Sequence, residues 1–359
     1  PNAQPVRQLA SLTVVPSADT PIEDPVLHDL AATVLQTARK TYPEADYVSV
    51  GMPEWRQWTN RYEDAWNALN TKYGLDKVAS LQAMLEKAGQ RTSYPGGAER
   101  AVAEVKGDLA ILYFYDRLFS DPAIWPQGSP KVLLTGVAEE LFPILPTIFS
   151  RGAETINLID YTAARVARRL DALNSLPAEL IPSSLVFTLH DDNVGVLPQL
   201  ATGSLHQLTT AMRASHWAGF QTRYWMIGDH DPCLAYLAKA AWDAGTTPDA
   251  IYRDQVRAVC GEAAVDDMLT AFRELEAVTV ALGDHALGLT FPVPGMIMNQ
   301  WAAAPLPPEL VADRETYQRA LVAARRALEK ASSAGKPYAA YWVGRLTFAV
   351  GYFDTIEAV

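Results

Sequence analysis

Acidic side chains follow five successive apolar runs, each long enough to be a β-strand. These acids are Glu54, Asp116, Glu139, Glu140, Asp160, Asp191 and Asp192. Two carboxyl groups that face one another can cleave a glycosidic bond, because one protonates the leaving oxygen while the other acts as base or nucleophile. These residue types therefore predict glycoside hydrolysis, provided that the elements carrying them bring their side chains together.

Aromatic and polar side chains lie next to these acids in the sequence. Aromatic rings stack on the apolar faces of sugars, and amide, imidazole and guanidinium groups bind sugar hydroxyls or carboxylates. The residues expected to bind a carbohydrate substrate are Trp55, Arg56, Tyr115, Asp116, Asn157, Asp160, His190, Asn193 and Trp225. We predict Glu54 as the general acid. The candidates for the second catalytic carboxylate are Glu139, Glu140, Asp191 and Asp192.

Several of these acids also have a structural interpretation. Glu54 can be a first-turn carboxylate that a helix dipole favours, as can the two acids after the fourth run. Asp160 precedes a helical pattern and can cap it, and Asp116 can pair with the adjacent arginine. The polar cluster at residues 190–193 directly follows an apolar run, where polar groups cost free energy unless they face a polar cavity. For that cluster, the sequence therefore favours a functional site over a structural role.

Apolar runs alternate with amphipathic helical patterns as far as residue 230. The expected strands are residues 9–15, 47–50, 109–115, 132–136, 156–159, 185–189 and 223–227, and the expected helices between them are 25–41, 62–73, 75–88 and 162–172. This α/β alternation without a glycine-rich phosphate turn predicts a (β/α)8-type (TIM) barrel over residues 1–230, with its site at the C-terminal ends of the strands. An eighth strand is expected either upstream of Pro1 or in an irregular segment.

The pattern becomes entirely helical after residue 230. Helices are expected at residues 233–243, 248–259, 263–282, 307–332 and 338–358, which predicts an all-α C-terminal region over residues 231–359. The Pro-, Gly- and Met-rich segment 286–308 separates two of them. Because long connections without structure of their own are often functional, we expect it to lie across the barrel mouth.

Composition excludes several classes of partner. The 359 residues carry a formal net charge of −11 and no basic run, which argues against nucleic acid and anionic membrane surfaces. The apolar runs are far shorter than the ~20 residues of a membrane span, so no membrane partner is expected. Cys233 and Cys260 lack the spacing of a zinc site, and no cofactor or metal is predicted. The sequence does not indicate the cellular compartment, and it allows a homo-oligomer.

Three segments carry a family resemblance: YPEADYVSVGMPEW, TLHDDN and YLAKAAWDAGTTPDAIYRDQVRAVCGEAAVDDM. Together they resemble bacterial glycoside hydrolases of the α-glucuronidase and β-hexosaminidase-like type, in which a barrel is followed by a long helical region. The likeness is one of layout and covers roughly residues 40–280. It implies a retaining or inverting hydrolase that acts on a glycan. It also implies that Glu54 matches the strand-end acid and that Asp191 or Asp192 matches a later base or substrate ligand.

Three other functions remain open. The first is a non-catalytic carbohydrate-binding barrel, in which the same aromatic and acidic residues hold a sugar without cleaving it. The second is a metal-dependent barrel hydrolase that uses His190, Asp191, His230 and Asp231, although the His-x-His pair usual in such barrels is absent. The third is an acidic rim that serves only solubility.

Overall fold

Five strands form a sheet in the order in which they occur along the chain, β1-β2-β3-β4-β5. They are β1 (Tyr47–Gly51), β2 (Lys131–Thr135), β3 (Ala153–Asn157), β4 (Ser184–Thr188) and β5 (Gly219–Arg223). The pairs β1–β2, β2–β3 and β3–β4 are parallel. An open doubly wound sheet reverses its strand order at a switch point, and this sheet has no such reversal. Its order is typical of barrel winding, but the described residues do not show a full eight-stranded barrel.

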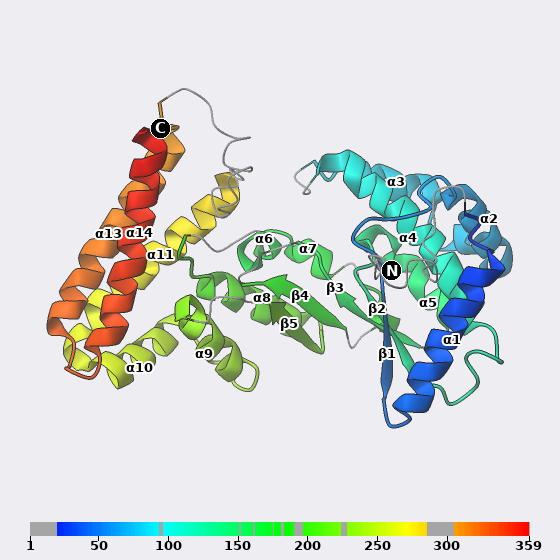
Figure 1. Cartoon of the computed structure of the whole chain (residues 1–359), viewed down its shortest axis with the longest axis horizontal. Coiled ribbons are helices and arrows are strands. Elements are labelled where there is room, and N and C mark those ends of the chain that lie inside the picture. Colours follow the sequence, from blue (N-terminus) through cyan, green and yellow to red (C-terminus); the bar gives the residue numbers. More distant parts are fainter. Residues whose placement is uncertain are drawn as a thin grey trace, which may run out of the picture. The chain divides into compact units, whose positions relative to one another are not determined.

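The structure is a computed structural model that describes residues 20–92, 96–150, 152–160, 162–174, 176–180, 183–189, 197–223, 228–285 and 305–358 (Figure 1). Its chain divides into two compact units. Unit 1 comprises Pro1–Ile159, Asp171–Val186 and Ser215–Phe220, and unit 2 comprises Asp160–Leu170, Phe187–Ala214 and Gln221–Val359. The predicted domain boundary near residue 230 stays a prediction.

The register of the sheet brings the C-terminal ends of its first strands to one edge. Gly51 lies opposite Thr135, and Thr135 lies opposite Ile156. The segments that follow β1, β2 and β3 therefore leave the sheet side by side. In parallel α/β sheets this edge is where ligands bind.

Three of the seven predicted strands agree closely with the structure, and two others overlap it only in part. The strands β1, β2 and β4 lie within one residue of the predicted positions. β3 begins at Ala153 instead of residue 156, and β5 begins at Gly219 instead of residue 223. The predicted strand at residues 9–15 lies outside the described residues.

The predicted strand at residues 109–115 is wrong, because these residues belong to the helix α4 (Gly97–Phe119). α4 packs against α1, α2, α3 and η3, so Leu109, Ala110, Ile111 and Leu112 are all buried. A continuous apolar run is what both a buried strand and a helix buried on several sides require. Tyr115 and Asp116 are therefore helix residues and do not follow a strand.

The predicted helices 25–41 and 62–73 are confirmed as α1 and α2, whereas the predicted helix 75–88 is divided into η2 and α3, and the predicted helix 162–172 is divided into α6 and α7. α1 begins after Asp24, whose carboxylate accepts hydrogen bonds from the amides of Val26 and Leu27 at 2.9 and 3.0 Å. α2 ends at Gly74, which has the left-handed φ of 67° that glycine adopts without strain. The elements are α1 (Pro25–Thr41), α2 (Tyr62–Tyr73), η2 (Leu75–Lys77), α3 (Leu81–Gly89), η3 (Glu139–Ile144), α5 (Leu145–Ile148) and η4 (Ala178–Leu180), with α7 (Leu170–Leu173) at the unit boundary.

Unit 2 contains the helical C-terminal region that the sequence predicts. In Figure 1, α13 and α14 lie side by side as a hairpin, and α11 packs against α13. The elements are α6 (Ala163–Ala167), α8 (Thr202–Ala214), η5 (Gly228–His230), α9 (Asp231–Ala240), α10 (Pro248–Cys260), η6 (Glu262–Ala264), α11 (Val265–His285), α13 (Pro308–Lys330) and α14 (Lys336–Ala358). Most of the segment expected across a barrel mouth, residues 286–304, lies outside the described residues. Cys233 and Cys260 are both free and buried.

Candidate functional site

The segment after β1 presents an acid and an aromatic ring to solvent. Glu54 is exposed, and the Trp55 side chain beside it is 63% exposed. Trp58, four residues after Glu54, is instead buried in the core of unit 1 and donates from Nε1 to the Thr20 carbonyl at 2.8 Å. Its φ of 56° is strained for a bulky residue, so packing fixes this end of the segment.

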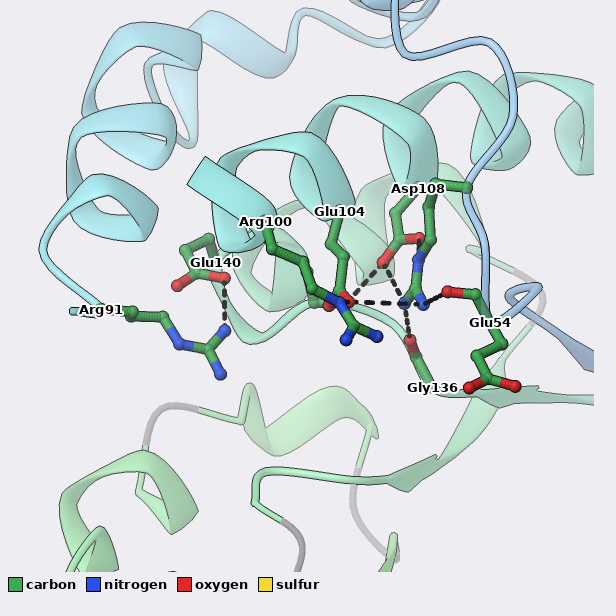
Figure 2. A network of polar contacts seen from close by, with 9 residues as sticks. Glu54, Arg91, Arg100, Glu104, Asp108, Gly136 and Glu140 are labelled. Carbon is green, nitrogen blue, oxygen red and sulfur yellow. Dashed lines mark hydrogen bonds and ion pairs between the residues drawn. The ribbon is translucent and has the colours of Figure 1, made fainter. Parts of the chain in front are cut away.

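Arg56 lies within the same segment and donates hydrogen bonds to α4, to the segment after β2 and to the backbone of Glu54. Figure 2 labels the Arg56 partners Asp108, Gly136 and Glu54. The Nε of Arg56 donates to Asp108 Oδ1 on α4 at 2.7 Å, and its Nη2 donates to Asp108 Oδ2 at 3.4 Å. Nη2 also donates to the Gly136 carbonyl after β2 at 2.9 Å, and Nη1 reaches the Glu54 carbonyl at 3.4 Å. Asp108 Oδ2 in turn accepts from the Ala138 amide at 2.8 Å. We call these five residues the Arg56 clasp.

A second arm of polar contacts leads along α4 to Trp55. Glu104 Oε1 lies 3.8 Å from Arg56 Nη1 and accepts from Arg100 Nε at 3.2 Å. The Arg100 guanidinium lies over the Trp55 ring, 5.4 Å from its centroid. One face of Trp55 is therefore occupied by a cation, while most of its surface remains exposed to a ligand.

Gly107 lets the Arg56 clasp pack directly on α4. A Cβ at this position would lie 2.4 Å from Arg56 Cβ and 3.2 Å from the Gln57 carbonyl oxygen, so a larger residue would push the segment away. Nearby on the same helix, the Tyr115 hydroxyl donates to the Gly51 carbonyl at 2.7 Å, at the end of β1. Burial raises the pKa of Tyr115 to about 12, so this phenol stays a donor. The predicted substrate ligands Arg56 and Tyr115 both make contacts that hold the site together.

The Asp108 carboxyl is completely buried, and this burial has the largest effect on its pKa. Burial raises its pKa to about 6, against the charge and hydrogen bonds of Arg56 and the hydrogen bond from Ala138, which lower it. The neighbouring Glu104 raises the pKa further. The pKa of Asp108 therefore lies above the ordinary range of an aspartate, although its carboxylate is paired with Arg56.

Glu139 and Glu140 begin η3 directly after the Arg56 clasp, and both are buried. Arg91 Nη1 lies 3.5 Å from Glu140 Oε2. Figure 2 marks this ion pair with a dashed line. Burial raises the pKa of Glu140, the Arg91 charge lowers it and the Glu139 charge raises it. A raised pKa favours the protonated form that a general acid needs, but the burial of Glu140 also keeps its carboxyl from solvent. By contrast, Figure 2 shows the Glu54 carboxylate turned away from the contacts that its own backbone carbonyl makes.

Three other predicted ligands are engaged within the protein. Asp116 accepts hydrogen bonds from Lys72, Tyr73 and Ser120, so it has a structural role, but its cation is Lys72 instead of the adjacent arginine. Asp160 lies 3.1 Å from Arg165 Nε, and Thr162 instead of Asp160 caps α6. Asn157 ends β3 in a buried position and donates to Thr155 Oγ1 at 2.6 Å, which leaves its Oδ1 without a partner among the described residues.

The remaining predicted site residues cannot be placed against these. His190, Asp191, Asp192, Asn193 and Trp225 lie outside the described residues, so the expected meeting of Glu54 with residues 190–192 stays a prediction. Within the part of the chain that is described, no group of three or more metal-binding side chains occurs.

The segment that carries His230 and Asp231, the two expected ligands of the alternative metal site that lie among the described residues, contains a structural ion pair. Arg345 donates to Asp229 from Nε to Oδ1 at 2.9 Å and from Nη2 to Oδ2 at 2.5 Å. The Tyr341 hydroxyl also donates to Asp229 Oδ1, at 2.6 Å. His230 is buried next to it, and burial raises the pKa of Asp231. Asp229 therefore joins η5 to α14.

Sequence reasoning missed Arg91, Arg100, Glu104, Asp108 and Gly107. Three of these, Arg100, Glu104 and Asp108, follow one another at four-residue spacing, which places them on one face of a helix. That spacing is the signal that the sequence offers, but the apolar run at residues 109–115 in the second half of α4 also fits a buried strand.

Comparison of the chain with protein-family models, with curated proteins and with solved structures finds no match in any of the three. Among the described residues, no helix combines the length and apolar character needed to cross a bilayer. The functional assignment therefore depends on the geometry of the site.

Proposed function

We propose that the protein is a glycoside hydrolase whose site lies at the C-terminal edge of β1 and β2, with Glu54 as its general acid. One observation carries this proposal: Glu54 and Trp55 are exposed side by side on a segment whose backbone is fixed by the Arg56 clasp and by Trp58. An exposed carboxyl beside an exposed aromatic ring provides both the proton donor and the stacking surface that a sugar requires. Fixing the segment in advance lowers the entropic cost of orienting the substrate.

The partner carboxylate is proposed among Glu139, Glu140, Asp191 and Asp192. The first two follow β2 at the same edge of the sheet as Glu54. In a retaining enzyme the two carboxyl groups lie about 5 Å apart, and in an inverting enzyme about 6.5 to 9.5 Å apart.

The second candidate function is glycan binding without cleavage, and the burial of Glu139 and Glu140 favours it. Both side chains are 5% exposed or less, so of the three acids predicted on these two segments only Glu54 can contact a ligand in this conformation. A site with a single accessible carboxylate and a tryptophan can hold a sugar but lacks the second group that cleavage needs.

The test is turnover of a panel of aryl glycosides and polysaccharides by wild type, Glu54→Gln and Glu44→Gln. Loss of the general acid is expected to lower kcat by about 10² to 10⁴ in Glu54→Gln. Glu44 is also exposed but precedes β1 at the opposite end of the strand, so Glu44→Gln should retain wild-type turnover. Undiminished turnover by Glu54→Gln removes Glu54 from the mechanism. Glycan binding by wild type without product release supports the second candidate instead.

A further inference from the structure

The Asp108 carboxylate contacts both segments that border the proposed site. Through Arg56 it is connected to the Glu54 carbonyl after β1, and through Oδ2 it accepts directly from the Ala138 amide after β2. The Gly136 carbonyl completes the connection by accepting from Arg56. A single side chain of α4 thus ties together two backbone segments that are far apart in the sequence.

The surroundings of Asp108 are shaped for this connection. Asp108 has no exposed surface and the Arg56 side chain is 12% exposed, so water does not compete for their hydrogen bonds. Gly107 supplies the space, although glycine inside a helix is less favourable than alanine by about 0.5 to 1 kcal/mol. The helix therefore gives up stability at the position where Arg56 must approach.

We propose that Asp108 is a positioning residue of this site: its ionised carboxylate holds Arg56, and with it the Glu54–Trp55 segment, against the segment after β2, and its protonation releases them. This inference rests on the proposed function in one respect only: it assumes that the Glu54–Trp55 segment is part of the site. Asp108 itself transfers no proton to substrate, because it is buried behind Arg56.

The pH at which release occurs follows from the groups around Asp108. Arg56 faces it from the segment after β1, Glu104 from its own helix, and Tyr115 from the next turns of α4. On η3, which packs against α4, Glu140 is paired with Arg91 and lies beside Glu139. With these neighbours the pKa of Asp108 is raised to about 6, and burial is the largest cause. Release is therefore expected as the pH falls through about 6.

Protonation of Asp108 is expected to loosen the segment around Glu54 but to increase the free energy of unfolding of the whole domain. The pKa of Asp108 is higher in the folded state than in the unfolded chain, so the folded state binds the proton more tightly. As the pH falls from 7 to 5, this group makes folding more favourable, not less. Loss of order around Glu54 over the same range therefore cannot be explained by general unfolding through Asp108.

The test is hydrogen–deuterium exchange of the full chain, read by mass spectrometry on peptides that cover residues 51–58 and corrected for the intrinsic pH dependence of exchange. In wild type, protection of this segment is expected to fall by about tenfold between pH 7 and pH 5, because the protonated fraction of Asp108 rises from about one tenth to about nine tenths over that range. In Asp108→Asn, which carries no charge at any pH, protection should be low throughout and show no midpoint. Asp229→Asn, which alters the buried pair of unit 2, should keep the wild-type midpoint in these peptides.

Two results overturn the proposal: wild-type protection that is flat between pH 7 and pH 5, or Asp108→Asn that retains full protection at pH 7. If Asp108→Asn does not fold, the wild-type titration still decides. Gly107→Ala then serves as the second variant, because it displaces Arg56 without removing a charge. Since exchange needs no glycan, failure of the hydrolase assignment leaves this measurement interpretable, and failure here leaves the Glu54→Gln test intact.

Discussion

Both units bury an arginine against an aspartate, but the two pairs are connected to different structures. In unit 2, Arg345 directs Nε and Nη2 to Asp229, which also accepts from Tyr341, so the pair joins η5 to α14. In unit 1, Arg56 makes one short contact to Asp108 and donates also to the Gly136 and Glu54 carbonyls. The same chemistry fixes one helix against a neighbouring element in unit 2, and positions two segments beside an exposed acid in unit 1.

The largest stability effect is expected in unit 2. Arg345→Met leaves Asp229 buried without its guanidinium, and breaking a buried pair in this way costs about 3 to 5 kcal/mol. Urea denaturation at neutral pH measures the loss. Protection of residues 51–58 should not change, and a specific loss of protection there would show that the two pairs do not act separately.

Arg56→Met is expected to cost less, about 1 to 3 kcal/mol at pH 7.5, because Asp108 can take up a proton when its partner is lost. The loss should be smaller at pH 5, where Asp108 is protonated in the folded wild type as well. Urea denaturation at both pH values tests this sign. A loss that is larger at pH 5 than at pH 7.5 contradicts the raised pKa of Asp108.

Two helical glycines offer a sharper comparison. Gly107→Ala forces Arg56 away from α4 and should destabilise by about 1 kcal/mol or more, despite alanine's better helix propensity. Gly344→Ala, on the exposed face of α14 with no atom near its Cβ, should stabilise by up to about 1 kcal/mol. Thermal unfolding of the two variants should shift in opposite directions. Equal shifts would mean that the close approach at Gly107 has no energetic consequence.

The smallest effect on stability is expected for Trp55→Ala, within about 0.5 kcal/mol, because the side chain is 63% exposed. The substitution should instead weaken glycan binding, with a loss of about 0.5 to 1.5 kcal/mol in binding free energy from the missing stacking. Isothermal titration calorimetry with a glycan that the wild type binds measures this loss. Unchanged affinity would remove Trp55 from the binding surface.

Local signals in the sequence were sufficient for most of the elements. Asp24 before Pro25 and Thr247 before Pro248 mark helix starts that the structure confirms. The strands before Glu54 and Glu139 were also predicted within one residue, which is why the edge that carries them was found. These features depend on neighbours in the chain.

The Arg56 clasp could not be predicted in the same way. Arg56 and Asp108 are 52 positions apart, and their pairing depends on how α4 packs against the segment after β1. The apolar residues 109–112 gave no helical periodicity, because α4 is buried on several sides. The four-residue spacing of Arg100, Glu104 and Asp108 indicated the helix, but it could not indicate which cation the buried carboxylate binds.

The most direct test of the central claim is affinity labelling with an epoxyalkyl glycoside, followed by peptide mapping. An epoxide tethered to a sugar reacts with a carboxylate that lies next to the bound glycan. The proposed site predicts esterification of Glu54, suppressed by competing glycan and absent in Glu54→Gln. Glycan-protected labelling confined to carboxylates far from the C-terminal edge of β1 and β2 would contradict the claim.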